Sequence, residues 1–225
     1  MLPAGACVLV LIVSNVSSLD ATLARAWAYG PAGWIGRGTW WAEDLLHDGG
    51  RSVVRAIAAL CGILAVAGVG RSWRRTAAYL FAAIAVSALV AGALKHVTNI
   101  DCPWDVRGFG GTRPYVHVLG DRPDALPHAA CFPGAHAASG FALMAFYFAF
   151  RDRSKRLARL GLATAVVTGI AFSVAQEARG AHFLSHDVTS AFLSWFTCLA
   201  LYRAMLQPAP ASQPLLEVPY ERSRT

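Results

Sequence analysis

The chain has 225 residues, of which 56% are hydrophobic and 15% charged, and its mean hydropathy is +0.44. A soluble domain usually carries about 25% charged residues, so this composition excludes an ordinary soluble fold and favours a polytopic membrane protein. The net charge of +7 fits basic residues at the cytoplasmic ends of membrane helices. No RNA-binding signature or zinc-ligand spacing is present in the sequence to indicate a nucleic-acid partner.

Six hydrophobic segments approach the length of about 20 apolar residues that a membrane-spanning helix needs. The first lacks a basic start and a small-residue cleavage site, so we expect an uncleaved anchor rather than a signal peptide. The predicted fold is all-α, a polytopic helical bundle with about six transmembrane helices in a single membrane-embedded domain over residues 1–206. The segments cover residues 2–19, 51–69, 76–97, 132–150, 157–178 and 186–206.

The connection over residues 20–50 is rich in tryptophan and tyrosine among polar residues. Amphipathic aromatic side chains favour the membrane–water interface, so an interfacial helix is predicted over roughly residues 39–47. His47 lies near Asp44 and Asp48, and we expect it to face solvent without a catalytic role.

Two short, strongly basic loops determine the predicted orientation. They lie between the second and third segments and between the fourth and fifth, and short basic loops stay in the cytoplasm. The loops over residues 20–50, 98–131 and 179–185 then face outward, into the periplasm if the membrane is a bacterial inner membrane. Residues 207–225 carry four prolines and are predicted to form a disordered cytoplasmic tail.

Cys102 and Cys131 bracket the large outer loop. In an oxidising compartment two such thiols can pair, so a disulfide between them is a hypothesis. Ionisable groups at membrane depth are costly and usually functional. Such groups stand at the outer ends of several segments, namely Lys95, His136, Arg179, His182 and His186.

Their chemistry suits a phosphate group. Arginine binds phosphate as a bidentate fork and lysine as a point charge, and backbone N–H groups at Gly134 and Ala135, at the start of the fourth segment, would face the same anion. A histidine can attack phosphorus, and a second histidine can protonate the leaving oxygen.

This pattern resembles the type 2 phosphatidic acid phosphatase superfamily, with its motifs Lys-x6-Arg-Pro, Pro-Ser-Gly-His and Ser-Arg-x5-His-x3-Asp. In the first motif Lys95 and the proline match, but Cys102 replaces the arginine. In the second, Gly134 replaces the serine. In the third, Gln176 stands at the arginine position and Asp187 comes one residue late.

The resemblance implies that His182 attacks phosphorus to form a phosphohistidine and that His136 protonates the leaving group. His186 or Asp187 would hold the second nitrogen of His182. Lys95 and Arg179 would neutralise the phosphoryl oxygens. Arg107 or Arg113, in the outer loop, would supply the missing arginine.

The implied function is that of a membrane lipid phosphatase without metal or cofactor. It would hydrolyse a lipid phosphomonoester or diphosphate of the phosphatidic acid, phosphatidylglycerol phosphate, undecaprenyl diphosphate or lipid A class, with the bilayer and this lipid as its partners. A lipid phosphotransferase using the same intermediate is an alternative. A non-catalytic transporter or scaffold is another, although a transporter would place its ionisable groups at the bilayer midplane.

Overall fold

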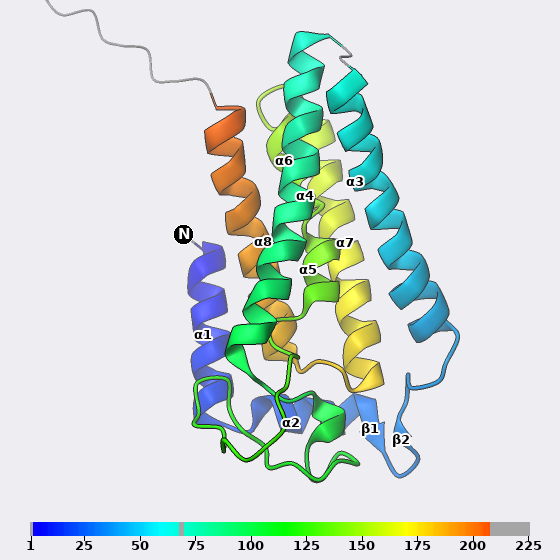
Figure 1. Ribbon diagram of the computed structural model, residues 1–225, viewed down its shortest axis with the longest axis vertical. Coiled ribbons are helices and arrows are strands. Elements are labelled where there is room, and N and C mark those ends of the chain that lie inside the picture. The colour runs from blue at the N-terminus through cyan, green and yellow to red at the C-terminus, as the bar shows by residue number, and fades with distance from the viewer. Residues whose placement is uncertain (1, 68–69, 208–225) are drawn as a thin grey trace, which may run out of the picture.

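The computed structural model describes residues 2–67 and 70–207, so the predicted tail lies, apart from Gln207, outside the described residues. Long helices form an elongated bundle (Figure 1). Short elements connect the first of these helices to the second. The bundle contains the long helices α1 (Leu2–Val16), α3 (Gly50–Ala67), α4 (Arg71–Thr98), α7 (Lys155–Arg179) and α8 (Leu184–Met205), and the two short consecutive helices α5 (Ala135–Phe141) and α6 (Met144–Phe150).

The short elements precede α3 or lie in the loop after α4. A two-stranded antiparallel sheet pairs Tyr29 with Trp34 and Gly30 with Gly33. The short elements are α2 (Leu19–Leu23), the π-helices η1 (Ala24–Ala28) and η2 (Trp41–Gly49), the strands β1 (Tyr29–Gly30) and β2 (Gly33–Trp34), and the 3-10 helix η3 (Pro103–Asp105).

Each of the six predicted hydrophobic segments is helical over most of its length. Within the described residues, length and composition suit a membrane crossing for Trp41–Ala67, Trp73–Asp105 and Lys155–Arg179, and for a fourth span if the bent pair Val8–Val16 and Leu19–Ala28 counts as one. Helices α5 and α6 form the shorter apolar stretch Ala135–Phe150. The chain is therefore a helical membrane protein with three or four candidate spans, and the number six stays a prediction.

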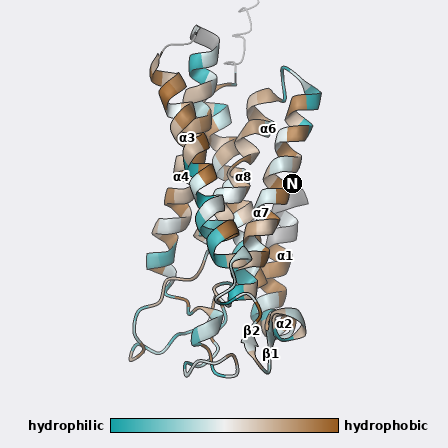
Figure 2. Ribbon diagram, turned by 90° about the vertical axis from the view of Figure 1, so that its right-hand side faces the viewer, coloured by the Kyte–Doolittle hydropathy of each residue, from teal (hydrophilic) through white to brown (hydrophobic). Residues whose placement is uncertain are grey.

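Helix α8 is not among these candidate spans, and it buries polar side chains inside the bundle. Ser185, Asp187, Ser190 and Ser194 are all buried, and Ser194 donates a hydrogen bond to the Ala138 carbonyl (3.1 Å). Polar residues of membrane helices usually face the bundle interior in this way. Large apolar side chains such as Val66 and Val167 point outward (83% and 68% exposed), and Figure 2 shows hydrophobic stretches along the long helices.

The predicted interfacial helix corresponds to η2, which runs without a break into α3. Its position relative to a membrane surface stays a prediction.

The two ends of the bundle differ. The last turn of α3, the first turn of α4 and the connection between α6 and α7 lie at one end, whereas the loop over residues 99–134, α2 and the β-hairpin cover the other (Figure 1). Trp34 and Phe109 stack within an apolar cluster of this cap, and the Trp34 indole donates to the Phe109 carbonyl (3.1 Å). A disulfide joins Cys102 to Cys131, whose Cα atoms are 5.1 Å apart.

Helices α5 and α7 pack closely because each carries a glycine at the contact. A Cβ atom on Gly140 would lie 3.0 Å from the Gly169 Cα, and one on Gly169 would lie 2.2 Å from the Phe141 ring. Small residues at such a contact let two membrane helices approach closely.

Gly169→Ala should therefore destabilise the protein by about 1–3 kcal/mol, the usual effect of overpacking a core. The matched control is Gly92→Ala in α4, where a Cβ atom would meet nothing within 4 Å, and its stability should be unchanged or slightly higher. Thermal unfolding in detergent measures both variants. Equal unfolding midpoints for the two would contradict the packing described.

Candidate active site

A cavity of about 240 Å³ lies at the capped end of the bundle. It brings together groups that the sequence separates by up to 135 residues. Lys95, His136, Arg179 and His182, all predicted from the sequence, line this one cavity together with Ala135. The remaining lining residues are His47, Arg51, Trp104, Cys131, Gln176 and Ala181.

His182 lies in the short connection between α7 and α8. Gly180 ends α7 in a left-handed conformation (φ +78°), and its Cα lies against Trp34, so that a Cβ atom would be 2.4 Å from the indole. Asp20 accepts hydrogen bonds from the Ser185 backbone N–H (3.0 Å) and hydroxyl, which fixes the first turn of α8 much as a capping side chain does.

The Nδ1 atom of His182 lies 2.7 Å from Oδ1 of Asp187, and both side chains are buried. Because a carboxylate accepts, Nδ1–H is the donor and Nε2 keeps its lone pair. Burial, assisted by Lys95 and Arg179, lowers the pKa of His182 well below its ordinary value, so the imidazole is neutral and able to act as a nucleophile at neutral pH.

Of the two candidate partners for His182, the structure places Asp187 against the ring and His186 away from it. The His186 ring centroid is 6.0 Å from that of His182, and His186 packs edge-on against Phe132 and Phe183. His186 is 1% exposed and does not line the cavity within the described residues.

Gly134 lies directly against the His182–Asp187 pair. A Cβ atom at this position would be 2.4 Å from Oδ1 of Asp187 and 2.6 Å from Nδ1 of His182, so no side chain fits where the superfamily motif has serine. The Gly134 N–H donates to the His186 carbonyl (3.4 Å) and is therefore not free for phosphate, contrary to the expectation from the sequence. Ala135 does line the cavity.

His136 lies in the first turn of α5 and stacks on Phe172, with ring centroids 4.3 Å apart. Its Nε2 atom lies 3.2 Å from the Leu46 carbonyl. Because a carbonyl only accepts, this contact places the proton on Nε2. Nδ1 is buried without a hydrogen-bond partner among the described residues, which leaves this nitrogen available to a bound ligand.

The prediction that His47 faces solvent is wrong. Its Nδ1 atom lies 2.8 Å from the Gln176 amide, and its Nε2 atom lies 3.0 Å from Arg51. Since a guanidinium group only donates, Nε2 accepts and His47 is neutral. The π-helix η2 leads directly into α3, which places His47 and Arg51 one helical turn apart at the cavity.

The cavity is cationic. Arg51, Lys95 and Arg179 line it, and no carboxylate of the described residues does. Arg179 contacts Gln176 through Nη1 (3.2 Å), and its Nε atom lies 3.5 Å from the Glu43 carboxylate. This arrangement suits a multiply charged anion such as a phosphoryl group.

Neither outer-loop arginine is part of this cavity. Arg107 is exposed, and Arg113 pairs with Asp101 and Asp105, the latter at 3.7 Å. Arg51 lies in the cavity instead. The sequence signal that could have identified it is the spacing of four residues between His47 and Arg51, which places both on one helix face.

Nowhere in residues 2–67 and 70–207 do three or more His, Cys, Asp or Glu side chains cluster as a metal site.

Of three comparisons with known proteins, one gives a match. No curated protein matches the chain, and no solved structure does. The family model described as PAP2 superfamily matches residues 76–208, a region that holds Lys95, His136, Arg179, His182 and Asp187. Because this match covers well over half of the sequence, the chain belongs to the PAP2 superfamily, the type 2 phosphatidic acid phosphatases.

Proposed function

We propose that this protein is an integral membrane lipid phosphatase that hydrolyses a lipid phosphomonoester or diphosphate through a phosphohistidine. Membership of the PAP2 superfamily supports a phosphatase-type activity. The observation that carries the proposal is the buried His182–Asp187 pair, with 2.7 Å between Nδ1 and Oδ1. His182 of this pair lines a cavity that cationic side chains also line.

In the first step, Nε2 of His182 attacks phosphorus as the bond from phosphorus to the lipid oxygen breaks. Asp187 stabilises the imidazolium that forms, since its carboxylate accepts the Nδ1–H hydrogen bond. Lys95, Arg179 and Arg51 neutralise the charge on the phosphoryl oxygens, which is the main task in phosphoryl transfer. These cations can fill that role without a metal ion.

His136 gives its proton to the leaving oxygen. For this it must be protonated on Nδ1, the nitrogen without a partner, while the Leu46 carbonyl keeps the proton on Nε2. The Leu46 carbonyl thus orients His136 as Asp187 orients His182. In the second step water attacks the phosphohistidine and releases inorganic phosphate; a lipid acceptor in place of water would make the enzyme a phosphotransferase.

We further propose that the cavity faces the periplasm of a bacterium. The basic turn at residues 151–156 lies at the opposite end of the bundle from the cap (Figure 1), and basic loops stay in the cytoplasm. The disulfide in the cap is of a kind that persists in oxidising compartments.

Substitutions at the His182–Asp187 pair test the mechanism. His182→Ala should abolish phosphate release from lipid phosphates in mixed micelles, and Asp187→Asn should slow it strongly because the imidazolium loses its charge partner. His136→Ala should slow the first step by about 10²–10⁴-fold. Activity of the unaltered protein should persist in chelator. Full activity in His182→Ala would refute the mechanism.

The space around Gly134 gives a second test. Gly134→Ser restores the serine of the superfamily motif, yet it should nearly abolish activity because its Cβ atom would displace the His182–Asp187 pair. Gly30→Ser is the control, since a Cβ atom there meets nothing within 4 Å, and it should keep its activity. Phosphate release from the same lipids measures both. An active Gly134→Ser enzyme would show that the pair is placed differently.

The orientation is tested by labelling in intact cells. A cysteine at Leu119, which is 80% exposed in the cap, should react with a membrane-impermeant maleimide applied from outside the inner membrane. A cysteine at Arg156, an exposed position at the other end, should react only after that membrane is broken. The reverse pattern would invert the topology.

A further inference from the structure

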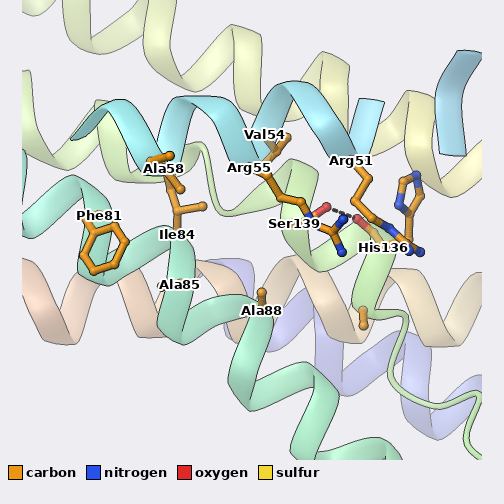
Figure 3. Close-up of a pocket in the computed structure, with 12 residues that line it drawn as sticks. Arg51, Val54, Arg55, Ala58, Phe81, Ile84, Ala85, Ala88, His136 and Ser139 are labelled. Atoms are coloured by element: carbon orange, nitrogen blue, oxygen red, sulfur yellow. Dashed lines mark hydrogen bonds between the residues drawn. The ribbon is translucent and has the colours of Figure 1, made fainter. Parts of the chain in front are cut away.

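A second, larger cavity adjoins the proposed catalytic one. It is a groove of about 490 Å³ between α3 and α4, and it shares Arg51, Ala135 and His136 with the catalytic cavity. The part far from His136 is apolar, with Ala58, Phe81, Ile84 and Ala85 among its lining residues (Figure 3). A hydrocarbon chain can therefore extend from the phosphoryl site along α3.

The polar groups of the groove gather at the end nearest His136. Arg51, Arg55 and Ser139 lie there, and the Ser139 hydroxyl donates to the His136 carbonyl (2.6 Å) (Figure 3). Arg51 and Arg55 are four residues apart on α3, so they share one helix face one turn apart. Helical side chains tilt toward the helix N-terminus, which in α3 is the end at the catalytic cavity.

Arg55 has no hydrogen bond, ion pair or aromatic contact with any described residue. No carboxylate of the described residues lines the groove, and Arg55 lies within the candidate span Trp41–Ala67. A cation at membrane depth is costly and is normally paired. Arg51 contacts His47 and reaches the catalytic cavity, whereas Arg55 lines only the groove.

We propose that Arg55, together with Arg51, binds a second phosphoryl group, and that the preferred substrate is the diphosphate ester of a long-chain alcohol. This inference rests on the proposed phosphatase function. The terminal phosphoryl group would lie at His182, the phosphoryl group next to the hydrocarbon would lie between Arg51 and Arg55, and the hydrocarbon would occupy the apolar part of the groove. A monophosphate of the same alcohol places only uncharged atoms beside Arg55 and leaves it unpaired.

Hydrolysis of such a substrate takes two steps. A bond forms between Nε2 of His182 and the terminal phosphorus while the bond from that phosphorus to the bridging oxygen breaks. The bridging oxygen leaves as part of a lipid monophosphate, whose negative charge Arg51 and Arg55 stabilise. Water then cleaves the phosphorus–nitrogen bond and releases inorganic phosphate. A phosphate leaving group needs no proton, so this reaction depends on His136 less than cleavage of a monoester does.

The test compares two lipids with the same chain, farnesyl diphosphate and farnesyl monophosphate, by the kcat/KM for phosphate release in mixed micelles. Arg55→Gln should lower kcat/KM for the diphosphate by about 10–100-fold, the effect of losing a charge-assisted hydrogen bond. For the monophosphate the change should stay within about twofold. Arg55→Lys should recover part of the loss. Arg159→Gln, at an exposed helical arginine at the opposite end, should change neither.

The outcomes separate this inference from the proposed function. If the unaltered enzyme hydrolyses both lipids but Arg55→Gln affects both equally, or neither, the second phosphoryl site is refuted and the phosphatase function stands. If the unaltered enzyme releases phosphate from neither lipid, nor from any other lipid phosphate, both are refuted. Thermal unfolding midpoints equal to that of the unaltered protein show that Arg55→Gln and Arg55→Lys are folded.

Discussion

The hydrogen bond between His182 and Asp187 is the interaction on which the rest of the site depends. It joins a residue in the four-residue connection between α7 and α8 to one in the first turn of α8, and both side chains are buried. The left-handed Gly180 ends α7 two residues before His182, which lets the His182 side chain reach Asp187. Asp20 accepts a hydrogen bond at the start of α8 and fixes its position. Gly134 leaves the space that the pair occupies. A change in any of these three would move the nucleophile.

The second constraint is electrostatic. At two positions where the superfamily motifs have arginine, the chain has Cys102, which forms a disulfide with Cys131, and Gln176, which contacts His47. Arg51, from outside the motifs, and Arg179 lie in the same cavity. Binding of a phosphoryl group requires cationic side chains at the catalytic cavity. A different helix can provide such a side chain, provided that it places the side chain at that cavity.

Sequence reasoning located the helices well because their hydrophobic length is a local property. The charge of the two basic loops also predicted that four site residues lie on one side of the membrane. The structure places all four around one cavity, namely Lys95, His136, Arg179 and His182. The superfamily match confirms the family resemblance.

The contacts of several site residues could not be predicted from the sequence, because they depend on how distant segments pack together. The choice between His186 and Asp187 depends on how the chain turns after Gly180. His47 reaches Gln176, 129 residues later, and no motif marks that contact. Arg113 had the expected residue type, but Asp101 and Asp105 hold it in the cap. The predicted sixth segment is α8, whose buried polar side chains depend on packing inside the bundle, and α8 is not among the candidate spans of the described residues.

The central claim is that His182 carries the phosphoryl group, and trapping the intermediate tests it most directly. The enzyme would be mixed with a phosphorus-labelled lipid phosphate, quenched in base within milliseconds, digested and analysed by mass spectrometry. We expect a phosphoryl group on the peptide that contains His182, stable in base, lost in acid, and absent in His182→Ala. A base-stable, acid-labile phosphoryl group on another histidine, or none while turnover proceeds at the quench time, would contradict the account.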